Sequence, residues 1–263
     1  LSSWSDEEVD AHLARGHSSY WLSTDAGTLA RHAELMRCTD IEGKRLAVDI
    51  KSDTFHAATE VTIYTQDYHG LFALMAGAIA VSNFNIVEAK IFTTNDGMAL
   101  DTFWIQDGAR GPLDDTRVIK KLELTIERTL TAVINPSQEL AKQSKIPNRT
   151  QIFEVTPRVL IDNTASHIFT VIEVSALDRR GLLYDVTQAI AGLGLSIATA
   201  RVATYGESAV DVFYVKDVFG LKVTHTSKLE QIQKELMTAI GSTGDKKVAD
   251  TGAKTQKAAA AAV

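Results

Sequence analysis

The sequence has a single cysteine and no long apolar run. One thiol, Cys38, excludes an internal disulfide and a cysteine metal cluster, which is typical of a protein from a reducing compartment. We expect this cysteine to be a buried structural residue. No apolar stretch approaches the roughly 20 residues that span a bilayer, and no signal peptide is visible. The sequence therefore predicts a cytoplasmic protein with no membrane contact.

Positive charge is also in deficit. Lysine and arginine number 27 against 33 aspartates and glutamates, which gives a formal net charge of −6 and a pI near 5.7. A chain of this charge has no electrostatic reason to bind nucleic acid or an anionic membrane, and we expect neither. Hydrophobic residues make up 45% of the chain, as in globular proteins, and a length of 263 residues suggests about two domains.

One short motif is present twice. DYHGLF (67–72) and DRRGLL (178–183) both read Asp-x-x-Gly-Leu-apolar, and Asp178 follows Asp67 by 111 residues. Each motif comes after a β-branched stretch and opens an apolar pattern with helical spacing. In the first copy a hairpin signal follows at Asn-Asp-Gly (95–97), and a further amphipathic helix comes after it. The chain therefore contains two copies of one structural unit.

The order of elements in each copy is strand, helix, strand, strand, helix. A ferredoxin-like βαββαβ unit has this order once a final strand is added. Residues 149–155 are our candidate for that strand in the first copy, and residues 157–163 for an extra strand that leads into the second. The second copy has no obvious final strand. Either a neighbouring segment such as 45–51 fills the place, or the sheet is incomplete.

The chain divides into four parts. Residues 1–44 have helical spacing but no core of their own, which predicts a connector from an upstream domain. Residues 45–156 and 157–241 are the two copies. Residues 242–263 have almost no large apolar side chain, which predicts disorder. The predicted fold class is α+β, with two tandem ferredoxin-like βαββαβ domains, an N-terminal helical connector and a disordered C-terminal tail.

These motifs resemble a known family. A βαββαβ unit with Asp-x-x-Gly-Leu-Leu between its first strand and first helix resembles the ACT domain, an amino-acid-sensing module. The carboxy-terminal tandem ACT region of the bifunctional uridylyltransferase/uridylyl-removing enzymes, which modify the PII nitrogen-signalling protein, is closely similar to three stretches. These are TEVTIYTQDYHGLFALMAGAIA, DGMALDTFWIQD and RRGLLYDVTQAIAGLGLSIATARVATYGESAVDVFYVKD. The resemblance covers roughly residues 1–241.

The resemblance implies a regulatory segment. L-glutamine is the implied ligand, PII the implied partner through the parent enzyme, and pairing of ACT domains in a homodimer is a further option. The family's transferase domain carries paired aspartates and its hydrolase domain an adjacent His-Asp pair, but this chain has no Asp-x-Asp triplet and no His-Asp dipeptide. A P-loop and a Gly-x-Ser-x-Gly motif are missing too. We expect no catalytic residue, no metal site and no cofactor in this segment, whereas the parent is expected to need Mg or Mn.

The two motif loops have the chemistry of an amino-acid site. A helix N-terminus leaves backbone N–H groups unpaired and favours a carboxylate, and a glycine lets a ligand approach the backbone closely. An aspartate can accept from an α-ammonium group. The segments 83–86 and 194–197, expected beside the loops, offer amide and hydroxyl groups to a side chain. The predicted glutamine-binding residues are Asp67, Tyr68, His69, Gly70, Leu71, Asn83, Asn85, Ile86, Asp178, Arg179, Arg180, Gly181, Leu182, Leu183, Ser196 and Ile197.

Plainer interpretations stay open. The loop glycines suit a tight turn without any ligand, the loop aspartates are common helix N-caps, and Arg179 and Arg180 are typical solvated side chains. At the level of function, an ACT region could serve another amino-acid-responsive enzyme. It could also be a structural module that dimerises without a ligand.

Overall fold

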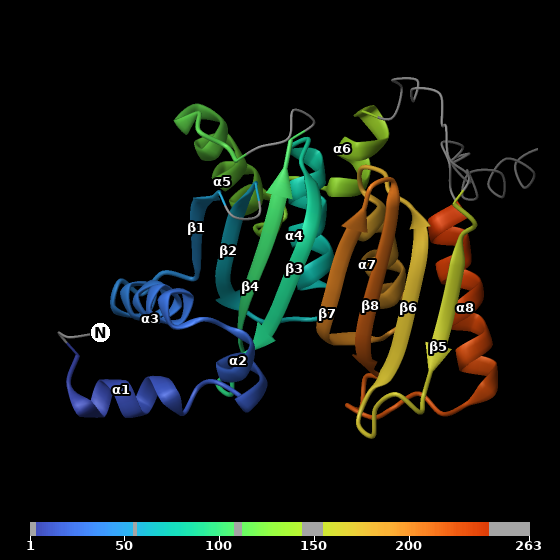
Figure 1. Cartoon of the computed structure of the whole chain (residues 1–263), viewed down its shortest axis with the longest axis horizontal. Coiled ribbons are helices and arrows are strands. Elements are labelled where there is room, and N and C mark those ends of the chain that lie inside the picture. The colour runs from blue at the N-terminus through green and yellow to red at the C-terminus, as the bar shows by residue number, and fades with distance from the viewer. Residues whose placement is uncertain (1–3, 55–56, 108–111, 144–154, 242–263) are drawn as a thin grey trace, which may run out of the picture.

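The structure, a computed structural model, describes residues 4–54, 57–107, 112–143 and 155–241. Their strands form one eight-stranded antiparallel sheet in the order β1-β2-β4-β3-β7-β8-β6-β5 (Figure 1). The strands are β1 (Leu46–Asp53), β2 (Ala58–Gln66), β3 (Asn85–Thr93), β4 (Met98–Gln106), β5 (Arg158–Asp162), β6 (Thr170–Leu177), β7 (Ser196–Tyr205) and β8 (Ser208–Lys216).

Helices cover one face of this sheet along its whole length. They lie behind it in Figure 1 and bury the main apolar core against it. These helices are α4 (Leu71–Val81), α5 (Thr116–Leu130), α7 (Leu182–Gly192) and α8 (Thr226–Gly241), with the short α6 (Pro136–Gln143) packed against α4.

The N-terminal helices pack on the opposite face of the first four strands. They are α1 (Asp6–Leu13), α2 (Ser18–Ser23) and α3 (Ala26–Ile41). Tyr20 and Met36 form a second apolar cluster with Tyr64 and Leu100 of the sheet. Successive strand residues point to opposite faces. Tyr64 therefore faces this cluster while its neighbour Ile63 belongs to the main core. The predicted connector is docked on the sheet.

The two copies of the repeat have the same order of elements, ββαββα. We call β1 to α5 the first half and β5 to α8 the second half. In each half the strand expected at the end of a βαββαβ unit is replaced by one that precedes it. β1 pairs with β2, and β5 pairs with β6.

Residues 157–163 contain β5, the strand that we expected to lead into the second copy. The option that residues 45–51 complete the second copy was wrong, because residues 46–51 belong to β1 at the edge of the first half. Residues 149–154 of the expected first-half strand lie outside the described residues. A strand that pairs with the next one along the chain needs only a short turn, and short loops cost little entropy to close.

The halves meet at the centre of the sheet and between two helices. β3 and β7 pair at Glu88 with Ala203 and at Ala89 with Val202. Behind them α4 packs on α7, and a Cβ atom on Gly77 would lie 2.8 Å from the ring of Tyr184. The backbone of α4 therefore approaches α7 too closely for any side chain at this position.

The position of Cys38 and the character of the helices bear on two of our expectations. Cys38 is exposed on α3, so the prediction of a buried thiol was wrong; it lies on the solvent side of the helix, away from Ala33 and Met36. Among the described residues, no helix is long and apolar enough to cross a membrane. The predicted tail, 242–263, lies outside the described residues.

Candidate ligand sites between the two halves

The two motif loops have the same backbone geometry. Gly70 and Gly181 occupy the N-cap positions of α4 and α7 with φ angles of 86° and 78°. These left-handed conformations are strained for residues with a Cβ atom. No side chain caps either helix, so the interpretation of Asp67 and Asp178 as N-caps was wrong. The first amide of each helix bonds a loop carbonyl, Leu71 to Tyr68 at 3.1 Å and Leu182 to Arg179 at 3.0 Å, and the following amides of the first turn have no side-chain cap.

Both loop aspartates are instead tied to the β-hairpin of their own half. The backbone N–H of Asp67 donates to the carbonyl of Gly97 at 3.0 Å, and that of Asp178 to Glu207 at 2.8 Å. The carboxylate of Asp67 accepts from the Thr93 hydroxyl at 3.1 Å. Burial raises the pKa of Asp178 above its ordinary value. The first loop therefore presents a more exposed carboxylate than the second.

A cavity of about 120 Å³ lies between the first loop and the second half. The residues of the loop form one wall. Thr187 and Ala191 of α7 and the entry to β7 form the opposite wall. The predicted site residues that meet there are Asp67, Tyr68, His69, Gly70, Leu71, Ser196 and Ile197.

A smaller cavity of about 30 Å³ lies between the second loop and the first half. Its predicted site residues are Asn85, Ile86, Asp178, Arg179, Arg180, Gly181, Leu182 and Leu183. Each loop therefore faces the strand-entry segment of the other half. From the sequence we expected each strand-entry segment to lie beside a loop, but we did not predict that it would be the loop of the other half. The exchange results from α4 and α7 packing side by side at the junction.

Basic side chains close the second cavity more tightly than the first. Arg180 donates from Nη1 to Oδ1 of Asn83 at 2.8 Å, across the junction. Arg179 pairs with Asp185 at 2.8 Å and donates to the carbonyl of Ala239 at 3.0 Å. The interpretation of these arginines as solvated was therefore wrong for Arg179. At the equivalent positions, the first loop has Tyr68 and His69.

The sequence is similar to enzymes of one family over most of its length. The chain is 49% identical to a bifunctional uridylyltransferase/uridylyl-removing enzyme from Azospirillum brasilense over 91% of its own length and 26% of that protein. It is 41% identical to the enzyme of that name from Rhodospirillum rubrum over 94% of the chain and 27% of the relative. A model of the ACR family N-terminal ACT domain matches residues 165–242. The chain is an ACT-domain region of the bifunctional uridylyltransferase/uridylyl-removing enzyme family.

This ACT region spans about a quarter of the length of those relatives. Among solved structures, an aspartate kinase from Synechocystis is 14% identical over 69% of the chain and 26% of the kinase, with a TM-score of 0.37. The described residues of the ACT region contain no group of three or more His, Cys, Asp or Glu side chains placed to hold a metal ion.

Sequence reasoning missed two buried carboxyl groups behind the loops of the ACT region. Asp101 of β4 and Asp211 of β8 occupy equivalent positions and are each 2% exposed. Burial, with Asp67 nearby, raises the pKa of Asp101 well above its ordinary range, and burial raises that of Asp211 to about 7. Asp101 also lines the first cavity. The shared spacing of Asp101 and Asp211 within the repeat was the available signal.

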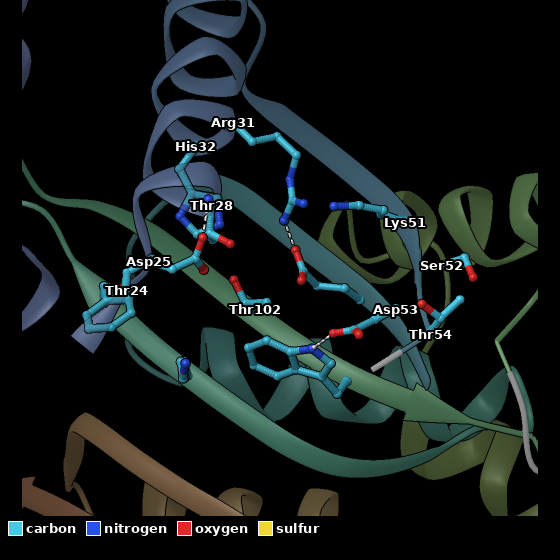
Figure 2. Close-up of a pocket in the computed structure, with 14 residues that line it drawn as sticks. Thr24, Asp25, Thr28, Arg31, His32, Lys51, Ser52, Asp53, Thr54 and Thr102 are labelled. Atoms are coloured by element: carbon cyan, nitrogen blue, oxygen red, sulfur yellow. Dashed lines mark hydrogen bonds and ion pairs between the residues drawn. The ribbon is translucent and has the colours of Figure 1, made fainter. Parts of the chain in front are cut away.

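A third and larger cavity, of about 390 Å³, lies between the connector and the open face of the sheet (Figure 2). Arg31 of α3 pairs there with Glu60 of β2, and the indole of Trp104 donates to Asp53 at 3.0 Å. Burial, with Arg31 nearby, lowers the pKa of His32 to about 4, so this ring is neutral at pH 7. The charges of Arg31 and Glu60 offset each other, and the cavity belongs to the docking of the connector on the ACT region.

Proposed function

We propose that this ACT region senses glutamine and regulates a parent enzyme that adds UMP to PII when glutamine is scarce and removes it when glutamine is plentiful. The observation that carries the proposal is the crossed arrangement of the loops. A ligand in the first cavity contacts the Asp67 loop of one half and the β7 entry of the other. Its affinity then depends on how the halves are arranged, which is the requirement for shifting that arrangement.

The first cavity suits a small amino acid. A volume of about 120 Å³ corresponds to roughly four water molecules at about 30 Å³ each, which is too little for a nucleotide. The uncapped N-terminus of α4 offers amide groups to an α-carboxylate, and Asp67 can accept from an α-ammonium group. The hydroxyl of Ser196 lies on the opposite wall, where a side-chain amide would reach it. These groups support glutamine as the ligand.

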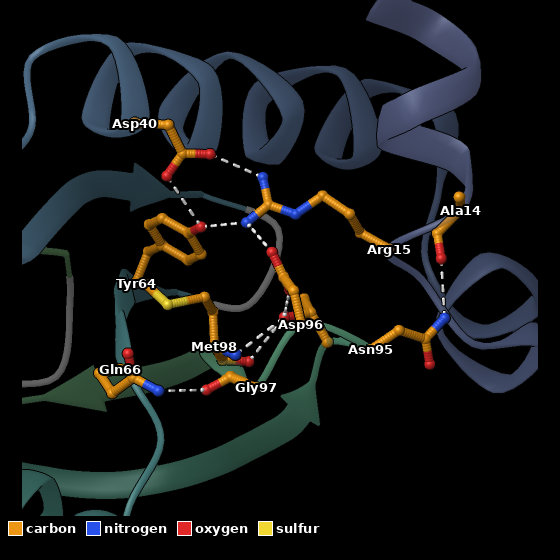
Figure 3. Close-up of polar contacts among 10 residues, drawn as sticks. Ala14, Arg15, Asp40, Tyr64, Gln66, Asn95, Asp96, Gly97 and Met98 are labelled. Atoms are coloured by element: carbon orange, nitrogen blue, oxygen red, sulfur yellow. Dashed lines mark hydrogen bonds and ion pairs between the residues drawn. The ribbon is translucent and has the colours of Figure 1, made fainter.

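A chain of polar contacts connects the first loop with the connector, and Figure 3 shows the part of it that runs from the hairpin to the connector. The loop binds the hairpin through Asp67 and Gly97, as described above. The next hairpin residue, Asp96, pairs with Arg15 at 2.8 Å, and Arg15 pairs with Asp40 of α3 at 2.7 Å. The side chain of Asn95 donates to the carbonyl of Ala14 at 2.8 Å. A shift of the loop would therefore reach the helices that precede the sheet.

Calorimetry with L-glutamine tests the proposal, with glutamate and asparagine as controls. Ligand at about 100 times its dissociation constant should stabilise the fold by roughly 2.7 kcal/mol, which raises the melting temperature by a few degrees. Selective binding of glutamine supports the proposal. Binding of a different amino acid would indicate an ACT region for another effector, and the absence of heat and of a melting shift with every amino acid would contradict a sensing role.

A ligand-independent dimerisation module is the second candidate. In the described part of the chain, β1 and β5 each end the sheet and present one unpaired edge, which a second copy could extend. This candidate predicts a dimer whose dissociation constant is unchanged by glutamine, measured by sedimentation. We also propose that the protein is cytoplasmic and that the parent enzyme needs Mg or Mn.

A further inference from the structure

Asp101 lies in an apolar part of the main core. Its neighbours in register are Ile63 on β2 and Ile91 on β3, and both are buried. The backbone N–H of Phe92 supplies one hydrogen bond to the carboxyl group. The Oδ1 atom has no hydrogen-bond partner among the described residues. A buried carboxyl group with an unsatisfied oxygen destabilises a fold, so its place on the wall of a cavity calls for a function.

The lining of the first cavity has acidic groups at one end and no ammonium or guanidinium group. The titratable side chains that face Asp101 across the cavity are Asp67, Tyr68 and His69, all from the first loop. The lining residues of α4, α7, β3 and the entry to β7 are apolar or carry hydroxyl groups. Asp101 and Asp67 are close enough to repel each other electrostatically. A positive charge between them is what this end of the cavity lacks.

We infer that Asp101 is a ligand-binding residue that, together with Asp67, holds the ammonium group of the ligand in the first cavity. This inference rests on the proposed function, because it takes the α-ammonium group of glutamine as the cation. The ammonium group lies between the loop carboxylate and the strand carboxylate. The α-carboxylate then points towards the N-terminus of α4, whose amides are uncapped.

An ammonium group bound beside Asp101 changes the protonation of its carboxyl group. Burial and the nearby Asp67 raise the pKa of Asp101 well above its ordinary value, which favours the protonated carboxyl group in the free protein. An adjacent ammonium group favours the ionised form and lowers that pKa. Binding therefore releases a proton from Asp101 to solvent. Affinity rises with pH up to the pKa of Asp101 in the free protein, by about tenfold per pH unit where one full proton is released.

Asp211 provides a matched control within the same chain. It is as buried as Asp101, its Oδ1 atom also lacks a partner among the described residues, and Asp178 stands beside it as Asp67 stands beside Asp101. Asp211 does not line the second cavity, which is smaller and is bordered by Arg179 and Arg180. The ammonium site therefore belongs to the first half.

The test is calorimetry of the full chain with L-glutamine in phosphate and in Tris at about pH 7, whose different ionisation enthalpies reveal the number of protons released. The wild type should release protons on binding, at most one from each site. Asp101→Asn, a neutral isostere of the protonated acid, should release none and bind about tenfold or more weakly above the pKa of Asp101, with the difference narrowing at lower pH. Asp211→Asn should keep both the affinity and the proton release of the wild type. His69→Gln should keep the proton release, which separates Asp101 from the nearby imidazole.

Each result separates the inference from the function on which it rests. Glutamine binding without proton release, or with release that persists in Asp101→Asn, would overturn the inference and leave the sensing function standing. Loss of release in His69→Gln alone would assign the proton to the imidazole and also overturn it. Failure of the wild type to bind glutamine at all would remove the proposed function and the inference together.

Discussion

The Nε2 atom of His69 lies 2.9 Å from the carbonyl oxygen of Ala191, near the C-terminal end of α7. Arg180, at the equivalent position of the other loop, reaches Asn83 just beyond the end of α4. The C-terminal end of a helix carries partial negative charge and exposed carbonyl groups, which favour a basic side chain. Each loop thus contacts the end of the other half's helix. A ligand that moves either loop would change the junction.

Replacing Gly70 by alanine should affect both stability and ligand binding. Its φ of 86° is strained for alanine, which costs about 1–2 kcal/mol, and the new Cβ would lie 3.9 Å from Ala191 on the opposite wall of the first cavity. Gly220→Ala is the matched control, because its φ is 75° and nothing lies within 4 Å. We expect urea unfolding to show similar losses in both variants and calorimetry to show weaker glutamine binding in Gly70→Ala alone. Equal affinities would exclude the first loop as a ligand site.

Gly77→Ala should loosen the junction of the two halves. The added Cβ would lie 2.7 Å from Pro136 and 2.8 Å from Tyr184, so α4 must move away from α6 and α7. Overpacking of this kind costs about 1–3 kcal/mol. The control, Gly192→Ala, is also helical but has nothing within 4 Å, so it should be neutral or slightly stabilising. Urea denaturation compares the two. A Gly77→Ala variant as stable as the wild type would show that α4 can move away from α6 and α7 at little cost in free energy.

The repeat and its loops were predictable because their signals are local. A glycine at a strand-to-helix turn and apolar side chains at helical spacing depend on neighbours within a few residues, and the structure confirms both at Gly70 and Gly181. Which strand completes each half depends on contacts between distant segments. β1 and β5 are both consistent with the sequence pattern, but nothing local assigns them to their edges.

Asp101 shows a different limit. In an alternating strand an aspartate is normally read as a solvent-facing residue. In the first half, however, helices cover one face of the sheet and the docked connector covers much of the other, so neither neighbour of Asp101 along the strand reaches solvent; Leu100 and Thr102 are both buried. Asp101 itself shares the helix-covered face with Ala99 and Phe103 of the main core. Its burial therefore depends on helices from distant parts of the chain, which its own neighbours in sequence do not encode.

Arg15→Gln should release the connector from the sheet. Arg15 pairs with Asp40 and Asp96 and contacts the hydroxyl of the buried Tyr64, so its loss leaves two carboxylates without a counter-charge. We expect a loss of about 1–2 kcal/mol and faster hydrogen exchange of the amides in α1–α3. Arg117→Gln is the control, since the side chain of Arg117 is 92% exposed and pairs with nearby Asp115 on the surface. Unchanged exchange in Arg15→Gln would contradict a role for this residue in coupling.

Asp211→Asn should stabilise the protein at neutral and alkaline pH. Burial raises the folded-state pKa of Asp211 to about 7, whereas an unfolded chain ionises near 3.9. Between these values the folded state binds more protons than the unfolded state, so the free energy of unfolding falls as pH rises through this window. Asparagine has no proton to lose and avoids the buried charge. We therefore expect urea unfolding of the variant and the wild type to coincide near pH 4 and to diverge by about 1–4 kcal/mol by roughly pH 8 in favour of the variant. Parallel curves over this range would mean that Asp211 ionises in the folded protein as easily as in the unfolded chain, which would contradict the raised pKa of this buried carboxyl group.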